Sequence, residues 1–202
     1  MTLALACLLA YLLGGIPFGL MLARLFAGVD IRTIGSGNVG ATNAARAFSG
    51  WRRPAMFALI YLLDFLKGYV PTQWFAAWFG APQPHAPLLL GVCAIAGHCF
   101  SPYLKLRGGK GVATGCGVFA ALEPAALGIA LLAFGLVWGV TRKVFIGSLT
   151  LGVALAAAVI ARDPGSAFGA RLGVTVFALA IAVFFFFTHR SNIAKAMAGA
   201  RA

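Results

Sequence analysis

The first residues that could do chemistry form the stretch GSGNVGATN, residues 35–43, which has glycines at positions 35, 37 and 40. This G-x-G-x-x-G spacing occurs in loops that bind the pyrophosphate of a dinucleotide, where a strand precedes the loop and a helix follows it. Here an apolar segment of helical length precedes the glycines. The acidic residue nearest the distance expected for a ribose contact, Asp64, lies inside a second apolar segment. The context therefore argues against dinucleotide binding.

The same stretch carries the small polar groups that bind a phosphate. Glycines allow backbone N–H groups to approach an anion, and hydroxyl, amide and guanidinium groups add further donors. A tight polar connection between two helices is the alternative, because glycine and asparagine also favour turns. We expect anion binding, since an arginine and several small donors coincide. The expected ligands are Gly35, Ser36, Gly37, Asn38, Gly40, Thr42, Asn43 and Arg46.

A second polar stretch, GHCFSPYLKLRGGKGVAT, covers residues 97–114. Its glycines and cations stand at the expected start of a helix, where N–H groups and the helix dipole favour anions. A nucleotide-binding P-loop would need a glycine at Leu104 and a hydroxyl at Gly111, so nucleotide hydrolysis is not supported. A positively charged loop with glycine turns is the alternative. The residues concerned are Lys105, Arg107, Gly108, Gly109, Lys110 and Gly111.

Other polar residues stand alone in or beside apolar segments. His98 is either a buried core residue or part of a site. Asp64 and Lys67, spaced i, i+3, form either an internal ion pair or a functional group inside the membrane, and we favour the structural role. The stretch THRSN follows the last apolar segment and contains His189, Arg190 and Asn192.

Conventional acid–base and metal chemistry has little support in this sequence. The chain has four acidic residues, too few to build a carboxylate pair or a carboxylate metal site. The H-x-x-x-x-D motif of many acyltransferases is absent, because Leu90, Tyr103 and Ala194 stand five residues after the three histidines. The four cysteines form no C-x-x-C pair and are expected to be buried thiols. We expect neither a metal nor a cofactor.

Composition identifies the elements that must position these residues. With 61% hydrophobic and 10% charged residues and a mean hydropathy of +0.94, the chain departs strongly from the roughly 25% charged residues of soluble domains. Its charge-free runs approach the length of about 20 residues that spans a bilayer. We therefore expect an all-α integral membrane protein. The positive-inside bias accounts for the net charge of +12, so no nucleic-acid partner is expected.

Seven transmembrane helices are expected, in a single membrane domain covering residues 1–202. The fourth is the weakest, because only residues 111–122 of it are free of charge. A periplasmic N-terminus and a cytoplasmic C-terminus leave only Arg162 and Arg171 on the outer side, as the positive-inside rule requires. The polar stretches then share the cytoplasmic face. The expected helices lie near residues 3–26, 54–79, 86–104, 108–122, 124–140, 144–161 and 168–188.

Taken together, the motifs resemble one known family. GSGNVGATNAAR, LDFLKG, GH followed by RGGKGVAT, GSL at residues 147–149 and HRSNIAK occur in the order and spacing of the bacterial acyl-phosphate:glycerol-3-phosphate acyltransferases, PlsY. The resemblance covers nearly the whole chain. It implies a seven-helix enzyme of the bacterial inner membrane, with its active site on the cytoplasmic side. The implied reaction transfers an acyl group from acyl phosphate to the 1-hydroxyl of glycerol-3-phosphate, giving lysophosphatidate and phosphate for phospholipid biosynthesis. Neither coenzyme A nor acyl carrier protein is then an expected partner.

The resemblance also suggests how the motifs divide the two substrates. The N–H groups of residues 108–111, with Ser36 and Asn38, are expected to hold the acyl phosphate. Glycerol-3-phosphate is expected to be anchored by Arg46, Lys110, His189 and Asn192, with Ser148 assisting. The alternative for Lys110 is that it serves the acyl phosphate. The proton of the attacking hydroxyl can pass to the departing phosphate, with His98 as the rival base, so positioning and charge stabilisation are the main tasks. The candidate catalytic residues are Ser36, Arg46, Lys110, His189 and Asn192, and the other substrate contacts include His98, Ser148 and Arg190.

Two other functions share some of these features. A small-anion transporter or channel is compatible with glycine loops and intramembrane charges, but its polar site would lie near the bilayer midplane. A coenzyme A-dependent acyltransferase would be expected to carry the missing His–Asp motif. The chain also departs from the PlsY pattern at three places. Ser101, followed by Pro102, stands where proline is usual, Phe145 stands where serine is frequent, and LRGGKG replaces FKGGKG.

Overall fold

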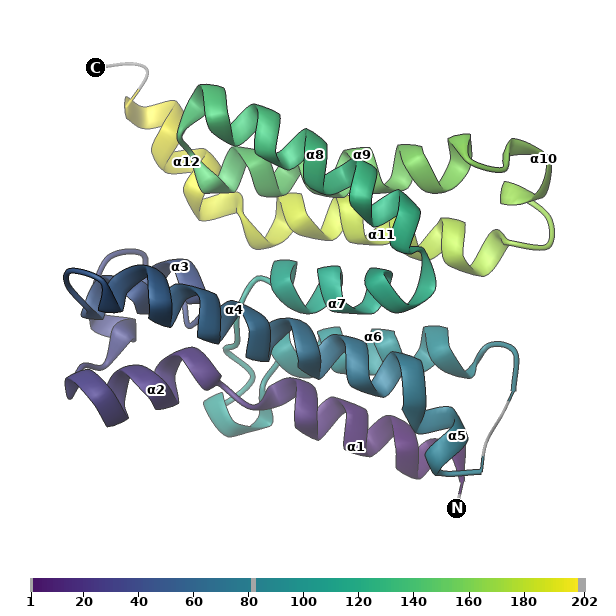
Figure 1. Ribbon diagram of the computed structural model, residues 1–202, viewed down its shortest axis with the longest axis horizontal. Helices are drawn as coiled ribbons and strands as arrows, with labels where there is room; N and C mark the ends of the chain where they lie inside the picture. The colour runs from purple at the N-terminus through teal and green to yellow at the C-terminus, as the bar shows by residue number, and fades with distance from the viewer. Residues whose placement is uncertain (1, 81–82, 200–202) are drawn as a thin grey trace. The chain divides into compact units, whose positions relative to one another are not determined.

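The computed structural model describes residues 2–80 and 83–199, and all the regular structure in these ranges is helical (Figure 1). The remaining residues of the expected domain, 1, 81–82 and 200–202, lie outside this description. The chain divides into two compact units, Met1–Leu122 and Glu123–Ala202. The helices of the first unit are α1 (Leu3–Gly15), α2 (Phe18–Ala27), α3 (Ala41–Ala44), α4 (Arg52–Val70), α5 (Ala76–Trp78), α6 (Ala86–Cys99) and α7 (Val112–Leu122). Those of the second are α8 (Pro124–Thr141), α9 (Val144–Ala161), α10 (Pro164–Ala167), α11 (Leu172–Thr188) and α12 (Arg190–Gly199).

The first apolar segment is broken, where one helix over residues 3–26 was expected. α1 ends at Gly15 and α2 begins at Phe18. Pro17 causes the break, because proline has no N–H to donate and holds the preceding residue away from helical geometry. Ile16 accordingly has a ψ of 119°. The two helices still form one apolar segment of 25 residues, long enough to cross a membrane.

The next two apolar segments also differ in detail from the expected helices. α4 continues through a π-helical turn at Pro71–Phe75 into α5, so that Arg52–Trp78 forms one segment of 27 residues. A π turn accommodates a proline inside a helix by re-forming the backbone pairing around it. α6 ends at Cys99 rather than at residue 104, and a 3₁₀ turn at Pro102–Leu104 follows.

α7 is the short helix of the first unit. It begins at Val112 rather than at residue 108, because Gly111 has a φ of 83°, outside the helical region. Its 11 residues rise about 17 Å, well short of a hydrocarbon core of about 30 Å. Within the described residues, five helical segments are long and apolar enough to cross a membrane, or six if α11 and α12 form one bent span. The number of seven spans and the orientation of the termini stay predictions.

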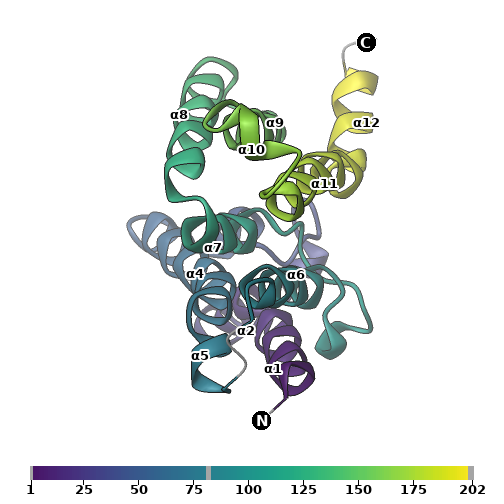
Figure 2. The same ribbon diagram turned by 90° about the vertical axis from the view of Figure 1, so that its right-hand side faces the viewer.

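Close helix–helix contacts through small residues hold the first unit together. An added Cβ at Gly97 of α6 would lie 2.0 Å from the Tyr11 carbonyl oxygen of α1. A Cβ at Gly117 of α7 would lie 2.0 Å from the Phe65 carbonyl oxygen of α4. Backbones approach this closely only where a small residue faces the neighbour, as in many membrane helix pairs. Figure 2 shows α1, α6, α4 and α7 as the resulting cluster. The pairing brings the end of α6 beside the break after α1.

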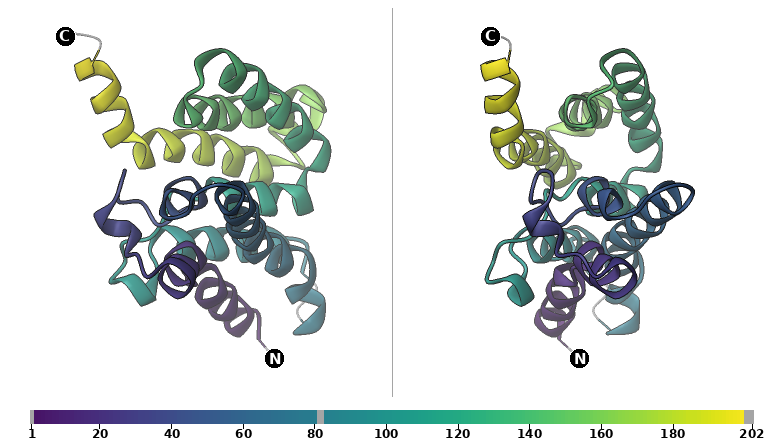
Figure 3. Two further views of the ribbon diagram at one scale, coloured as in Figure 1. Left: turned by 60° about the vertical axis from the view of Figure 1, so that its left-hand side comes forward. Right: turned by 90° about the vertical axis from the view of Figure 1, so that its left-hand side faces the viewer.

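The second unit is built around α9, which packs against both α8 and α11. Its last described helix, α12, bends by 50° from α11, as the yellow end of the chain in Figure 3 shows. α11 begins at Leu172, four residues later than expected, after the short helix α10. At this end of the unit the guanidinium of Arg171 forms an ion pair with the carboxylate of Glu123.

Candidate active site

The GSGNVGATN loop, residues 35–43, is shaped by the buried side chain of Asn43. Its Oδ1 accepts a hydrogen bond from the Ser36 N–H at 3.0 Å. Its Nδ2 donates to the carbonyl oxygens of Ile31, at 2.7 Å, and Ile34, at 3.2 Å. The amide therefore spends both donor hydrogens and one acceptor position on the loop backbone. Asn43 was expected to bind substrate, and in this structure its buried side chain holds the backbone of the loop.

The polar groups that the loop presents on its surface are Ser36, Thr42 and Arg46, all of which are exposed. The Arg46 side chain crosses Gly35, where an added Cβ would lie 2.9 Å from Arg46 Cδ and 2.4 Å from Asn43 Oδ1. Gly35 also has a φ of 55°, which favours glycine. The Ser36 hydroxyl accepts a long hydrogen bond, 3.5 Å, from the Asn38 N–H. The structure thus places both Ser36 and the Arg46 side chain beside Gly35.

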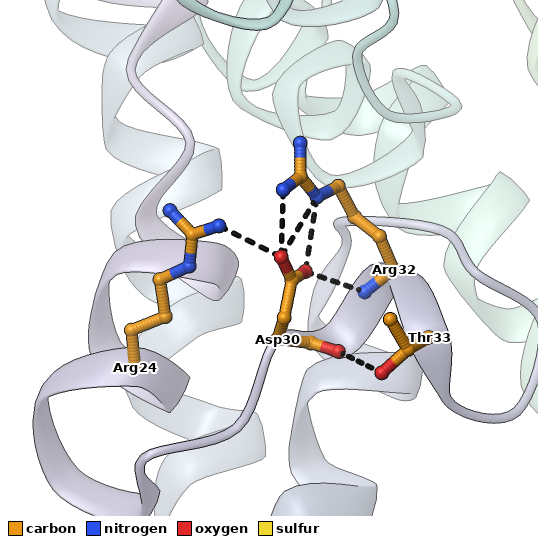
Figure 4. A network of polar contacts seen from close by, with 4 residues as sticks. All are labelled: Arg24, Asp30, Arg32 and Thr33. Carbon is orange, nitrogen blue, oxygen red and sulfur yellow. Dashed lines mark hydrogen bonds and ion pairs between the residues drawn. The ribbon is translucent and has the colours of Figure 1, made fainter.

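The segment that leads into this loop carries a cluster of charges (Figure 4). Asp30 accepts hydrogen bonds from Arg24 at 2.7 Å and from Arg32 Nη2 at 2.6 Å. The Arg32 side chain, and secondly that of Arg24, holds the pKa of the Asp30 carboxyl well below its ordinary value. Asp30 in turn raises the pKa of the Arg32 guanidinium. The cluster closes the turn from α2 towards the loop, and sequence reasoning did not include it.

The GGKG loop, residues 105–111, is held by the end of α6. The Gly108 N–H donates to the Cys99 carbonyl at 3.0 Å, and the Gly109 N–H donates to the His98 carbonyl at 2.9 Å. These two N–H groups were expected to hold phosphate, and in this structure each donates to a backbone carbonyl instead. An added Cβ would lie 1.9 Å from the His98 carbonyl oxygen at Gly108, and 2.1 Å from His98 Nε2 at Gly109. Both glycines are needed here for close packing.

The rest of the GGKG loop retains features of an anion site. Lys110 is partly buried and stands two residues before α7, and the exposed residues Lys105 and Arg107 add positive charge. The first N–H groups of a helix have no partner within the helix, and they carry the positive end of its dipole. Lys105 also has a φ of 52°, so the chain turns sharply where it leaves the 3₁₀ turn. The positive charge and the helix start are therefore adjacent.

A small cavity lies between the two loops and α4, with a volume of about 10 Å³, near the smallest that holds one water molecule. Lys67 lines it and forms the expected ion pair with Asp64, at 2.7 Å. His98 lines it too, with its Nδ1 3.9 Å from the Asp64 carboxylate. Sequence reasoning left Asp64, Lys67 and Ser101 out of the site. An ionisable pair inside an apolar helix was the signal that could have included them.

The remaining candidates lie in the second unit and are tied to their own helices. The Ser148 hydroxyl of α9 donates to the Val144 carbonyl at 3.0 Å. His189 stands at the bend after α11, where its Nδ1 donates to the Phe185 carbonyl at 2.8 Å. This bond fixes the proton of a neutral ring on Nδ1. Arg190 donates to the Phe187 carbonyl and stacks on its ring. Asn192 lies in the first turn of α12.

The two glycine loops of the first unit offer cations, a hydroxyl and a helix start, which are groups that can bind phosphate. Comparison with known proteins is decisive at this point. The family model described as glycerol-3-phosphate acyltransferase matches residues 4–199. The chain belongs to this family.

Relatives and solved structures agree with the family assignment. The glycerol-3-phosphate acyltransferase of Anaeromyxobacter dehalogenans (strain 2CP-C) is 44% identical over 192 residues, covering 94% of this chain and 90% of the relative. That of Myxococcus xanthus is 40% identical over 188 residues, covering 93% and 92%.

Two solved structures of PlsY (YgiH), an integral membrane glycerol 3-phosphate acyltransferase, resemble the fold. The glycerol 3-phosphate form has a TM-score of 0.84 and 31% identity, covering 98% of this chain and 92% of the other. The lysophosphatidic acid form has a TM-score of 0.82 and 30% identity over the same shares. The acyltransferase family and its membrane character are thus shown, and the transporter alternative loses its basis.

Proposed function

We propose that this protein transfers a fatty acyl group from acyl phosphate to the 1-hydroxyl of glycerol-3-phosphate, releasing lysophosphatidate and phosphate. The observation that carries the proposal is similarity over 98% of the chain to PlsY, solved in forms with glycerol 3-phosphate and with lysophosphatidic acid. The donor is acyl phosphate, and neither coenzyme A nor acyl carrier protein takes part. Cationic loops suit two substrates that both carry phosphate.

The protein works as one polytopic domain of seven spans in the bacterial inner membrane, with its N-terminus in the periplasm. α7 is the short span, and both glycine loops and the C-terminus face the cytoplasm. The distribution of Lys and Arg supports this orientation. Reporter fusions at each terminus and after Gly80 test it, because a cytoplasmic signal from the N-terminal fusion contradicts the arrangement.

The reaction needs little acid–base assistance. The glycerol-3-phosphate hydroxyl oxygen attacks the acyl carbon, the bond from that carbon to the phosphate oxygen breaks, and the phosphate leaves with the electron pair. The departing phosphate takes the proton of the hydroxyl, since the Asp64 carboxylate that lines the cavity is already paired with Lys67. The protein's contribution is to hold two anions together in the right geometry and to stabilise the developing charge.

The residue roles follow the geometry of each loop. Ser36 and Asn38, with Lys110 and the first N–H groups of α7, hold the acyl phosphate. Arg46 of the first unit holds the phosphate of glycerol-3-phosphate. His189 and Asn192 of the second unit stay candidates for contacts with that substrate. The loop N–H groups of Gly108 and Gly109 take no part, because they bind backbone carbonyls. The other expected contacts stay secondary candidates for substrate binding: Thr42, Gly111, Ser148 and Arg190.

The direct test is turnover by the purified, lipid-supplied protein given acyl phosphate and glycerol-3-phosphate, followed by phosphate release and lysophosphatidate formation. Acyl-coenzyme A and acyl carrier protein thioesters are the comparison donors. Product from acyl phosphate alone supports the proposal. A folded preparation that is inactive with acyl phosphate, or that uses a thioester equally well, overturns it.

Four variants test the residue roles in the same assay: Ser36→Ala, Arg46→Ala, Lys110→Ala and His189→Ala. Each is expected to lower kcat/KM by about 100-fold or more, the scale of losing a charge-stabilising donor. Arg46→Ala should raise the KM for glycerol-3-phosphate more than that for acyl phosphate. Ser49→Ala, an exposed neighbour outside the loop, is the matched control and should keep wild-type rates. Wild-type activity in any of the four removes that residue from the site.

A further inference from the structure

The break between α1 and α2 leaves two backbone carbonyls that side chains satisfy. The carbonyls of the last helical turn lack intrahelical partners, and inside a membrane segment they have to be satisfied by protein. Ser101 Oγ donates to the Gly15 carbonyl at 2.6 Å. Lys67 Nζ donates to the Ile16 carbonyl at 2.9 Å, and the Phe18 N–H donates to the same carbonyl at 3.1 Å. A residue after α6 and a residue of α4 therefore hold the same two-residue break.

Lys67 is itself fixed in place by burial and by charge. Its side chain is 2% exposed, that of Asp64 is 4% exposed, and their ion pair is 2.7 Å long. Asp64 Oδ1 also lies 3.9 Å from His98 Nδ1, which has no hydrogen-bond partner among the residues that the structure describes. The Lys67 ammonium thus stands between the α1–α2 break and the end of α6.

The break bears directly on the GSGNVGATN loop. α2 starts just after the held carbonyl, and an added Cβ at its Gly19 would lie 2.3 Å from the Val39 carbonyl oxygen. Val39 belongs to the loop and lines the same cavity as Lys67. A shift of the break therefore moves α2 against the loop backbone, because Gly19 has no side chain between its backbone and the Val39 carbonyl.

The GGKG loop is connected to the α1–α2 break through the end of α6. Its Gly108 and Gly109 N–H groups bind the carbonyls of Cys99 and His98 at the end of α6. Ser101, two residues further on, binds the break through its hydroxyl. The end of α6 thus contacts the GGKG loop through its carbonyls and the break through Ser101.

We propose that Lys67, paired with Asp64, is a positioning residue that fixes the two glycine loops relative to each other. The consequence for catalysis rests on the acyl transfer proposed above, whereas the consequence for loop order does not. A pair retained only for stability would behave differently. Replacing a buried ion pair by apolar residues of similar volume is often neutral or stabilising, whereas positioning through the Ile16 carbonyl requires the Lys67 donor.

The decisive variant is therefore Asp64→Leu combined with Lys67→Met, which leaves no buried charge unpaired. Hydrogen exchange of the detergent-solubilised protein is expected to be about tenfold faster in residues 31–39 and 105–111, since local opening is governed by local contacts. The thermal midpoint should stay near that of wild type. The KM for glycerol-3-phosphate should rise about tenfold through the misplaced loops.

The matched control removes a partly buried ion pair of the second unit, by Glu123→Leu with Arg171→Met. Exchange in the two loops should then stay at the wild-type rate. Asp64→Asn is the second variant, because it keeps the shape of the side chain and should accelerate exchange in both loops to a smaller extent. It decides the matter if the double variant does not fold.

Wild-type exchange in both loops of the folded double variant, or of Asp64→Asn where only that variant folds, overturns the proposal. The proposal is also overturned if the control variant, Glu123→Leu with Arg171→Met, accelerates exchange in both loops. The effect would then not be specific to Lys67. The exchange measurement needs no turnover. If wild-type protein does not transfer acyl groups but the loops respond as described, the proposed function fails and the positioning role stands.

Discussion

The two glycine loops look alike in sequence but are held by different means. A side chain organises the GSGNVGATN loop, as Asn43 binds one N–H and two carbonyls of residues 31–36. The main chain of α6 organises the GGKG loop, whose two leading glycines bind carbonyls of His98 and Cys99. The first loop shows exposed Ser36 and Arg46 on its surface. The second presents a partly buried lysine at a helix start.

This difference shows that a glycine pattern locates a loop but does not say which of its donors face a ligand. A glycine is needed equally where the backbone must approach an anion and where it must approach another backbone. At Gly108 the second reason applies, because a side chain would meet the His98 carbonyl oxygen at 1.9 Å. Substitutions in the two loops should therefore differ in their effects on stability, activity and hydrogen exchange.

Among substitutions that disturb how the two loops are held, the largest effect is expected from Gly108→Ala. The added methyl meets backbone rather than a movable side chain, so the GGKG loop must shift away from α6. Overpacking of this kind costs about 1–3 kcal/mol of unfolding free energy. A displacement of the loop near 1 Å lowers kcat/KM by about 100-fold. Thermal unfolding in detergent and steady-state kinetics measure the two effects.

Gly128→Ala in α8 is the control for this prediction, because an added Cβ there meets no atom within 4 Å. It should leave activity unchanged and stabilise slightly, since alanine is the better helix former. If Gly108→Ala behaves like Gly128→Ala, the GGKG loop is not held by the end of α6, and the contrast between the two loops disappears.

A smaller effect is expected from Asn43→Ala in the first loop. The substitution leaves one N–H and two carbonyls without their side-chain partner, and water can reach part of the loop because Ser36 is exposed. A lost partner of a buried polar group costs about 1–3 kcal/mol. Activity should fall about tenfold, through loosening of the loop that carries Ser36 and Arg46.

The KM for glycerol-3-phosphate and hydrogen exchange of residues 31–38 test this prediction together. In Asn43→Ala the KM and the exchange rate of residues 31–38 should both rise, while the exchange rate of residues 105–111 stays unchanged. Ser49→Ala controls for loss of a polar side chain nearby. Acceleration of both loops to the same degree would mean that Asn43 acts on more than its own loop.

Much of the fold could be predicted because charges and prolines mark where apolar segments end. Glu123 separates α7 from α8, whose first residue is Pro124, and Arg142 and Lys143 separate α8 from α9. The break at Pro17 was missed, since a single proline within a charge-free run does not change the hydropathy. The continuation of α4 through Pro71 shows the opposite outcome for the same residue type, so packing by neighbours decides between a break and a π turn.

The site was predicted unevenly for a related reason. Residue types and spacing located Ser36, Arg46 and Lys110 in loops, and these positions depend on local sequence. The hydrogen-bond partners of Gly109 and the contact from Lys67 to Ile16, 51 residues apart, depend on tertiary packing. Sequence spacing carries no direct information about such partners, which is why the loop donors were assigned to phosphate.

The smallest effect is expected from a substitution at Asp30. It compares the GSGNVGATN loop, which follows an exposed charge cluster, with the GGKG loop, which is held by backbone carbonyls of α6. Asp30→Asn removes the charge that holds Arg24 and Arg32 before the first loop. Exposed ion pairs contribute little, so activity should change by at most about twofold. The difference from wild type should shrink as salt is raised, because exposed charges are screened.

The pH dependence of this variant follows from the lowered pKa of Asp30. A carboxyl with a depressed pKa in the folded state stabilises above its unfolded pKa of about 3.9 and loses that contribution as pH falls through the lower folded value. The difference between wild type and Asp30→Asn in the exchange of residues 28–34 should therefore be constant from pH 8 to about pH 5. Exchange of residues 105–111 should be the same in both proteins at every salt concentration, because that loop is held by backbone carbonyls. A salt-dependent change there would show that the surface charges reach both loops.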